Sequence, residues 1–255
     1  MYAKTFFDGM KAEGQENIIN LLRCAWAGSQ KYGALVWSGD IKSSFPSMKN
    51  QVAAGLNMGI AGIPWWTTDI GGFFGANIND PEFHELLVRW FEYGCFCPVM
   101  RLHGYRWPLQ PQYGTTGGAT CVSGAPNEVW SYTDQVCEIL SDYLRLRERM
   151  LPYITELMEE AHEKGTPVMR PLFYDFPEDK ESWNVETEYM FGPKVLVKPI
   201  TDADARETDV YLPGGASWTN AWTGETFEGG QKVHVAAPIE QIPLFTRDGY
   251  KLPMK

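Results

Sequence analysis

The sequence has no long hydrophobic run, no excess of positive charge and no recognisable framework of paired cysteines. No stretch approaches the ~20 apolar residues that a membrane span requires, and the first residues lack the apolar core of a signal peptide. The 22 Lys and Arg are outnumbered by 32 Asp and Glu, giving a formal net charge of −10. Such a charge repels phosphate backbones and anionic lipids, so we expect neither nucleic acid nor membrane partners.

The five cysteines follow no zinc or disulfide spacing, so we expect reduced and mostly buried thiols. No metal or phosphate motif is present either. In contrast, aromatic residues are plentiful, with 10 Trp, 12 Tyr and 13 Phe. Most of them would fill a core, but aromatic faces also stack well on sugars.

Apolar runs and helical spacings alternate along the first two thirds of the chain. Strands are expected at 16–26, 33–37, 58–66 and 97–103, and helices at 47–56, 81–93 and 127–164. Pro152 predicts a break near Met150, and Gly165 predicts the end of the last helix. Strands alternating with helices predict a parallel sheet, open or closed.

From Thr166 onward the pattern changes to short alternating runs separated by turns, which predicts a second, antiparallel β domain. The boundary is expected near residues 163–167. This divides the chain into domains 1–165 and 166–255.

Two aspartates follow apolar runs that end in tryptophan and small residues, in Trp37-Ser-Gly-Asp40 and Trp66-Thr-Thr-Asp69-Ile-Gly-Gly-Phe73. Cleavage of a glycoside needs one carboxylic acid that protonates the leaving oxygen and one carboxylate across the anomeric carbon. Asp40 is the candidate acid, with Trp37 as an apolar wall that would keep its carboxyl group protonated. The alternative is a helix N-cap or turn.

Asp69 can accept hydrogen bonds from adjacent sugar hydroxyls, with paired glycines letting the backbone approach a ligand, or it can form an Asx-turn. His103 would bind a sugar hydroxyl or satisfy a buried backbone group. Arg23 would hold a catalytic carboxylate ionised or bind a hydroxyl pair. All three follow apolar runs that end near glycine, and such strand ends face one mouth of a barrel.

Other arginines have structural interpretations. Arg101 and Arg106 flank His103 and are expected as structural ion-pair partners. The run from Arg145 to Arg149 has the spacing of a solvated helix face.

Taken together, Arg23…Trp37-Ser-Gly-Asp40, Trp66-Thr-Thr-Asp69-Ile-Gly-Gly-Phe73 and Arg101-Leu-His103-Gly resemble glycoside hydrolase family 31, which contains α-glucosidases and α-xylosidases. The resemblance implies the C-terminal half of a (β/α)8 TIM barrel followed by an antiparallel β-sandwich domain. It implies that Asp40 is the general acid/base and that no cofactor is needed. The substrate-binding positions would be Arg23, Trp37, Trp66, Asp69, Phe73 and His103.

The family's nucleophile is an aspartate in a Trp-x-Asp-x-x-Glu-like segment on an earlier strand. No such segment precedes Asp40, and the surroundings of Asp8 do not match it. We therefore expect a C-terminal fragment that contains barrel strands 5 to 8. Half a barrel exposes sheet edges, which favours self-association or pairing with a complementing N-terminal fragment.

The expected function is part of a retaining α-glycosidase that hydrolyses terminal α-linked glucose or xylose from oligosaccharides or other α-glycosides. Transglycosylation would use the same residues. A catalytically silent fragment that binds carbohydrate or another chain is the alternative from a different class. A different barrel hydrolase or isomerase would need a metal or phosphate motif, which the sequence lacks.

Overall fold

The computed structural model describes residues 1–254. The helices are α1 (Tyr2–Ala12), α2 (Phe45–Ile60), α3 (Pro81–Cys95), α4 (Asp134–Arg149), α5 (Leu151–Lys164) and α6 (Leu172–Asp175), with short 3-10 turns at Ser29–Tyr32, Gly117–Thr120, Val129–Ser131 and Lys180–Trp183. The strands are β1 (Asn20–Leu22), β2 (Ala34–Val36), β3 (Ala76–Asn77), β4 (Arg106–Trp107), β5 (Met169–Pro171), β6 (Tyr189–Phe191), β7 (Val195–Val197), β8 (Glu207–Leu212), β9 (Ser217–Asn220), β10 (Thr226–Glu228), β11 (Gln231–Ala236) and β12 (Leu244–Arg247).

Parallel pairing joins successive chain segments in the first part of the molecule. Strands β1 and β2 run parallel, and β2 continues the pairing through a parallel bridge between Val36 and Trp66. The next segment follows through a hydrogen bond from Val99 N to Trp66 O, 3.1 Å long, and a parallel bridge between Ile70 and Leu102. This confirms the predicted parallel pairing and places the carboxyl ends of four segments along one edge.

Helix α2 is longer than expected. It begins at Ser44, whose hydroxyl oxygen accepts a hydrogen bond from Ser47 N, and it runs to Ile60. Residues 58–60, predicted as strand, are therefore helical. The buried face of the helix includes Gly59, where an added Cβ would lie 2.9 Å from Pro167. The helix therefore packs closely against Pro167 within the apolar run that had suggested a strand.

Helices α3 and α5 agree with the sequence pattern, whereas α4 begins at Asp134 and not near residue 127 as predicted. Helix α3 begins at Asp80, whose carboxylate accepts a hydrogen bond from Glu82 N at 3.0 Å. The predicted break separates α4 from α5 at Met150, and Pro152 lies in the first turn of α5. Gly165 ends α5 with a left-handed backbone, φ +71°.

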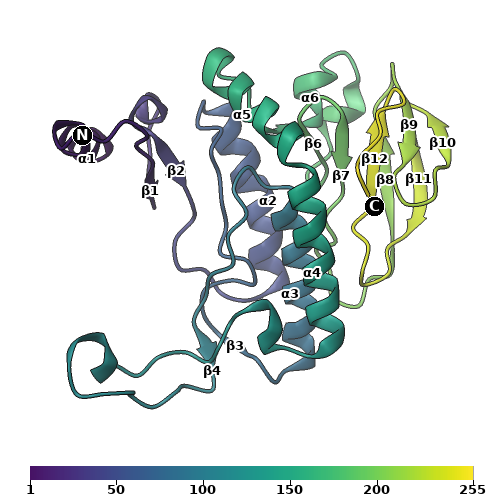
Figure 1. The fold of residues 1–255 in the computed structure, drawn as a ribbon. Coiled ribbons are helices and arrows are strands. Elements are labelled where there is room, and N and C mark those ends of the chain that lie inside the picture. Colours follow the sequence, from purple (N-terminus) through teal and green to yellow (C-terminus); the bar gives the residue numbers. More distant parts are fainter. Residues whose placement is uncertain (255) are drawn as a thin grey trace.

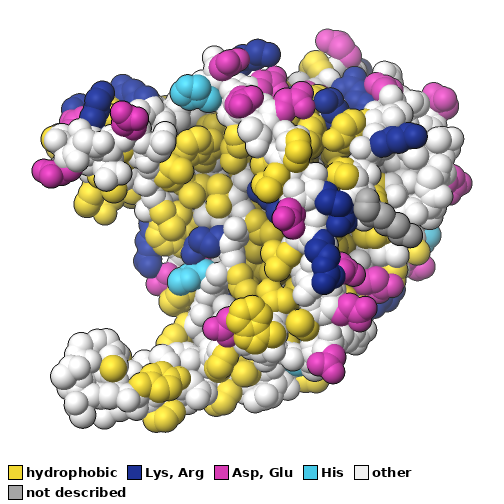
Figure 2. Space-filling view, viewed as in Figure 1, with side chains coloured by type: hydrophobic (Ala, Val, Ile, Leu, Met, Phe, Trp, Pro, Cys, Tyr) yellow, Lys and Arg dark blue, Asp and Glu magenta, His cyan; other side chains and the backbone are white. Residues whose placement is uncertain are grey.

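Helix α1 was not predicted. With β1 and β2 it forms a small unit that projects from the main body (Figure 1). A second projection, the arm 108–126, lies on the same side and carries no charged residue. Figure 2 shows a hollow between the two projections, with apolar side chains gathered in it.

The C-terminal part is antiparallel, as expected from Thr166 onward. Its larger sheet has the strand order β10-β9-β12-β7-β6-β5, and β8 pairs with β11 in a second sheet. Side chains from alternate positions of β6 and β7 divide between two cores. Tyr189, Phe191, Val195 and Val197 pack with the helices, whereas Met190 and Leu196 pack with Val210, Leu212 and Val233 of the small sheet.

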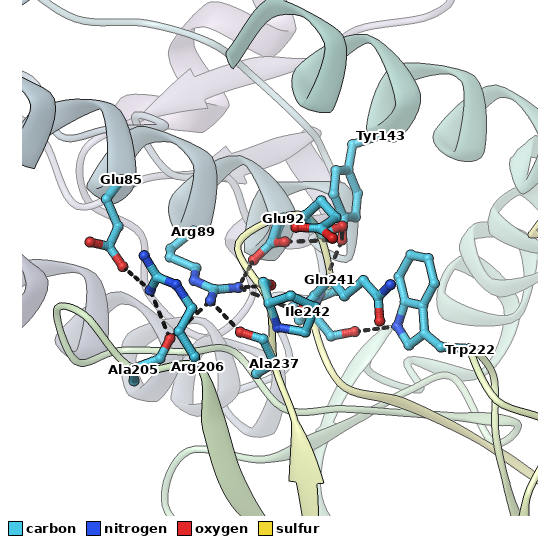
Figure 3. A network of polar contacts seen from close by, with 12 residues as sticks. Glu85, Arg89, Glu92, Tyr143, Ala205, Arg206, Trp222, Ala237, Gln241 and Ile242 are labelled. Carbon is cyan, nitrogen blue, oxygen red and sulfur yellow. Dashed lines mark hydrogen bonds and ion pairs between the residues drawn. The ribbon is translucent and has the colours of Figure 1, made fainter. Parts of the chain in front are cut away.

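A buried polar network joins the helices to the C-terminal part (Figure 3). Arg89 of α3 pairs with Glu92 at 3.1 Å and donates hydrogen bonds to four carbonyl oxygens, those of Ala205, Ala237, Pro238 and Gln241. Tyr143 Oη of α4 lies 3.1 Å from both Glu92 Oε1 and Glu240 O, and accepts a hydrogen bond from Ile242 N. Burial raises the pKa of Glu92 to about 8.

The expectation for the arginine run in α4 is wrong for two of its three members. Arg147 turns inward and donates to the carbonyl oxygens of Cys95, Cys97 and Pro98 at 2.7–2.8 Å, where α3 ends and leaves such groups without helical partners. Arg149 binds the carbonyl oxygens of Pro253 and Met254. Arg145 alone lies on the solvated face, 65% exposed and paired with Asp142.

The cysteines are all unpaired thiols, but they are less buried than expected. Cys95 and Cys97 are buried, Cys137 is half-buried, and Cys24 and Cys121 are exposed. Burial raises the pKa of the Cys95 and Cys97 thiols to about 12, so these two groups stay protonated at neutral pH. Within residues 1–254, no helix combines the length and the apolar character needed to cross a bilayer.

Candidate active site

The predicted acid, Asp40, lies in the loop that follows β2. Its Oδ1 accepts a hydrogen bond from Arg23 Nη2 at 2.7 Å, which brings together the ends of two neighbouring strands. Both side chains remain open to solvent, 59% exposed for Arg23 and 40% for Asp40. The N-cap interpretation of Asp40 is wrong, because Ser44 caps α2.

Trp37 lies against two arginine side chains of the site. The guanidinium carbon of Arg23 lies 5.5 Å from the centre of its ring system, and that of Arg101 lies 5.6 Å from it. Cations at this distance are attracted by the electrons of an indole. Trp37 therefore contacts two guanidinium groups, while its role as an apolar wall beside Asp40 stays a prediction.

Asp69 is fully buried, with 0% of its side chain exposed, and forms an ion pair with Arg101. Its carboxylate is therefore not open to a sugar, and it does not form the Asx-turn that was the alternative. Burial raises the pKa of Asp69, while the positive charges of Arg101 and His103 oppose this rise. Asp69 Oδ2, Arg101 Nε and Trp37 Nε1 are buried without a hydrogen-bond partner among the described residues.

Arg106 shapes the turn that follows Asp69. Its guanidinium group is buried and donates hydrogen bonds to the carbonyl oxygens of Ile70 and Gly72, at 3.1 and 2.7 Å, and to the side chain of Asn127. Arg106 was expected to form a structural ion pair, but its partners are backbone carbonyls and the neutral side chain of Asn127. A lone arginine gives no sequence signal for that role.

The paired glycines of this turn have a structural purpose. Gly71 and Gly72 have φ angles of +85° and +74°, a backbone conformation that residues with a side chain rarely adopt. An added Cβ on Gly72 would lie 2.6 Å from Ser43 Cα. The glycines therefore allow close approach of the protein's own backbone, which differs from the ligand approach expected from the sequence.

Phe73 and His103 stand together at the edge of the site. Their ring centres lie 5.6 Å apart with the planes tilted by 31°. His103 is exposed, so it does not satisfy a buried backbone group, and Phe73 is half-buried. Both are placed where a ligand can reach them.

Trp66 does not belong to this surface. Its side chain is 2% exposed within the main hydrophobic core, and an added Cβ on Gly55 would lie 2.8 Å from its ring. The expected contact with substrate is therefore not available in this structure. Successive residues of an extended segment point to opposite sides, and the sequence does not show which tryptophan of Trp65-Trp66 faces inward.

Comparison with known proteins decides the family. The model of the glycosyl hydrolases family 31 TIM-barrel domain matches residues 1–157, and that of the family's C-terminal domain matches residues 165–252. The chain belongs to glycoside hydrolase family 31. Sequence of the family's TIM-barrel domain is thus followed in this chain by the family's C-terminal domain.

Several relatives carry more specific names. A crystal structure of a GH31 α-xylosidase from a soil metagenome, complexed with xylose, matches with a TM-score of 0.93 and 54% identity over 98% of this chain and 37% of the other. An α-xylosidase of Saccharolobus solfataricus is 37% identical over 100% of this chain and 32% of its own length. An α-glucosidase 2 of Bacillus thermoamyloliquefaciens is 34% identical over 98% of this chain and 29% of its own. The chain thus spans about a third of the length of these relatives.

Proposed function

We propose that this family 31 chain supplies the acid/base half of a retaining α-glycosidase site, acting on terminal α-linked xylose or glucose. The observation that carries the proposal is the contact of Arg23 with both Asp40 and Trp37, where the ends of two parallel strands lie side by side. Because family 31 consists of glycosidases, we interpret these side chains as part of a sugar-cleaving site. The sugar-binding side chains in this proposal are Arg23, Trp37, Phe73 and His103.

In the proposed reaction, Asp40 protonates the leaving oxygen and afterwards removes a proton from the attacking water. Giving up the first proton leaves Asp40 as a carboxylate, and the proton taken from water in the second step restores the acid. Arg23, 2.7 Å away, would turn to a sugar hydroxyl when substrate enters, which frees the carboxyl group to take up a proton. Attack by a second sugar in place of water would give transglycosylation with the same residues.

A retaining enzyme also needs a carboxylate nucleophile about 5–5.5 Å from the acid. Asp69 is near enough to Asp40 for the two charges to interact, but it is buried and paired with Arg101. We propose that the nucleophile comes from a segment outside this chain. A complementing N-terminal fragment or another copy would then be the partner.

Membership of family 31 also supports a proposal for the architecture. The four parallel segments would be strands 5 to 8 of a (β/α)8 barrel over residues 1–165. The two antiparallel sheets, which share a core, would form a β-sandwich over residues 166–255.

Xylose is the first substrate to test, because the relative of 54% identity is an α-xylosidase with xylose bound. Glucose is the second, because an α-glucosidase matches over nearly the whole chain. The test is release of nitrophenol from the aryl α-xyloside and α-glucoside by the purified chain, with Asp40→Asn as the control. Turnover that disappears in the control supports the acid/base assignment.

No turnover combined with measurable binding of either sugar would favour the alternative, a catalytically silent carbohydrate-binding fragment. Turnover that persists in Asp40→Asn would contradict the role given to Asp40. Sedimentation of the same sample reports self-association, and a compact monomer would argue against it.

A further inference from the structure

Two Arg–Asp pairs flank the ring of Trp37, and they differ in exposure. The pair of Arg23 and Asp40 is open to solvent, 59% and 40% exposed. In the second pair, Arg101 retains 22% exposure while Asp69 has none. In the second pair the arginine thus reaches the solvent and the aspartate does not.

From this geometry we infer that Arg101 is the side chain that meets substrate at this point, and that Asp69 is a positioning residue acting through it. The inference rests on the proposed function, and it changes the role that the family resemblance gave to Asp69. It adds Arg101 to the substrate-binding groups.

The chemistry of the two side chains supports this arrangement. A guanidinium group has five N–H donors in a rigid plane, and Asp69 binds only the Nη2 group. The remaining donors suit the lone pairs of a neutral hydroxyl or ring oxygen. Asp69 also offsets the charge that would otherwise stand unpaired beside Arg23, since both guanidinium groups lie over one indole.

Burial supports it as well. A carboxylate that bound sugar directly would present an oxygen to the solvent, but both carboxylate oxygens of Asp69 lie beneath the surface. Its Oδ2 has no partner among the described residues, and neither has Arg101 Nε, so each of the two groups retains an unused hydrogen-bonding position. The ion pair and the ring of Trp37 hold the guanidinium plane from two directions.

The first measurement needs no sugar. In 15N-labelled protein, the Arg101 side chain should give separate, slowly exchanging Nη signals, because the ion pair hinders rotation of the guanidinium group. In Asp69→Asn these signals should average as they do in free arginine. Averaged signals in the unchanged protein would overturn the positioning role of Asp69, whatever the protein does with sugars.

The second measurement is a double-mutant cycle on xylose and glucose affinity, followed by chemical shifts. We expect Arg101→Met to weaken binding about tenfold or more, Asp69→Asn to weaken it less, and the double variant to equal Arg101→Met. Arg101→Lys, which keeps the charge and the pairing, should restore part of the affinity. If the losses of the two single variants multiply, Asp69 contacts the sugar itself and the inference is wrong.

A matched control is the exposed pair of Arg145 and Asp142 on α4, 2.7 Å apart. Arg145→Met should leave sugar affinity and the Arg101 signals unchanged. Failure of the unchanged protein to bind either sugar would count against the proposed function and the substrate contact of Arg101. The anchoring by Asp69 would still be decided by the Arg101 signals of the free protein.

Discussion

The guanidinium group of Arg106 donates a hydrogen bond to the carbonyl oxygen of Gly72 at 2.7 Å, and this contact holds the turn that carries Phe73. We predict that Arg106→Met lowers the free energy of unfolding by about 2–4 kcal/mol, because it leaves several buried carbonyl groups without donors. Urea unfolding would measure the loss. Arg145→Met serves as the control, and an equal small effect of both changes would contradict the role of Arg106.

Gly72 should not accept a side chain. Its φ of +74° is unfavourable for alanine, and the added Cβ would lie 2.6 Å from the backbone of Ser43. Gly215 has a similar φ, +85°, with nothing within 4 Å of the added atom. Gly72→Ala is therefore expected to lose more stability than Gly215→Ala, by about 1–3 kcal/mol, since overpacking adds to the backbone cost. Equal urea midpoints for the two variants would contradict this, because they would mean that the turn shifts to accept the added methyl group without loss of stability.

Glu92 makes stability depend on pH. Burial raises its pKa to about 8 in the folded chain from an ordinary value of 4.5, so the folded state holds an extra proton between these values. The contribution of this proton is fully present below pH 4.5 and is lost as the pH rises through 8. We expect the free energy of unfolding to fall over this interval, by at most about 1.4 kcal/mol per pH unit.

The matched variant is Glu92→Gln, which is neutral at every pH and keeps a similar shape. Urea unfolding at pH 5, 6.5 and 8 should give a flatter dependence for the variant than for the unchanged protein. A protonated Glu92 can donate to Tyr143 Oη, which leaves the tyrosine hydrogen for Glu240 O. Identical slopes for the two proteins would mean that Glu92 is ionised in the fold.

Arg147, which lies on the neighbouring helix α4, donates hydrogen bonds to three carbonyl oxygens at the end of α3. We predict that Arg147→Met lowers the free energy of unfolding by about 2–3 kcal/mol, through unsatisfied carbonyl groups. Arg147→Lys should recover only part of this, because one ammonium group cannot reproduce the planar fork of donors. Hydrogen exchange of the last amides in α3 would show whether the damage is local.

The spacing of apolar residues and the position of proline predicted those elements that depend on local sequence alone. Helix α3 and the break at Met150 follow from apolar spacing and proline, which act locally. The end of α2 did not follow, because the apolar run at 58–60 fits either a helix or a buried strand until its neighbours are known. Helix α1 was not predicted, although Tyr2, Phe6 and Met10 recur at helical spacing, and Ala3 is its only buried residue.

The same limit applies to the site. Motifs at strand ends correctly placed Asp40 and Arg23 beside each other, since parallel strands bring their ends together. They could not distinguish an exposed carboxylate from a buried one, and Asp69 and Trp66 both proved to be covered. Arg106 and Arg147 bind backbone carbonyls, and such partners have no side chain that a sequence could reveal.

The network around Arg89 affects how the molecule unfolds. Its guanidinium group reaches carbonyl oxygens of residues 205–241 from within α3, and β6 and β7 share one core with the helices (Figure 3). Separating the two regions would leave the charge of Arg89 without its carbonyl partners, and it would expose the face of β6 and β7 that packs on the helices. Heating should therefore melt residues 1–254 in a single cooperative transition, and cleavage at Gly165 should not release two independently stable halves.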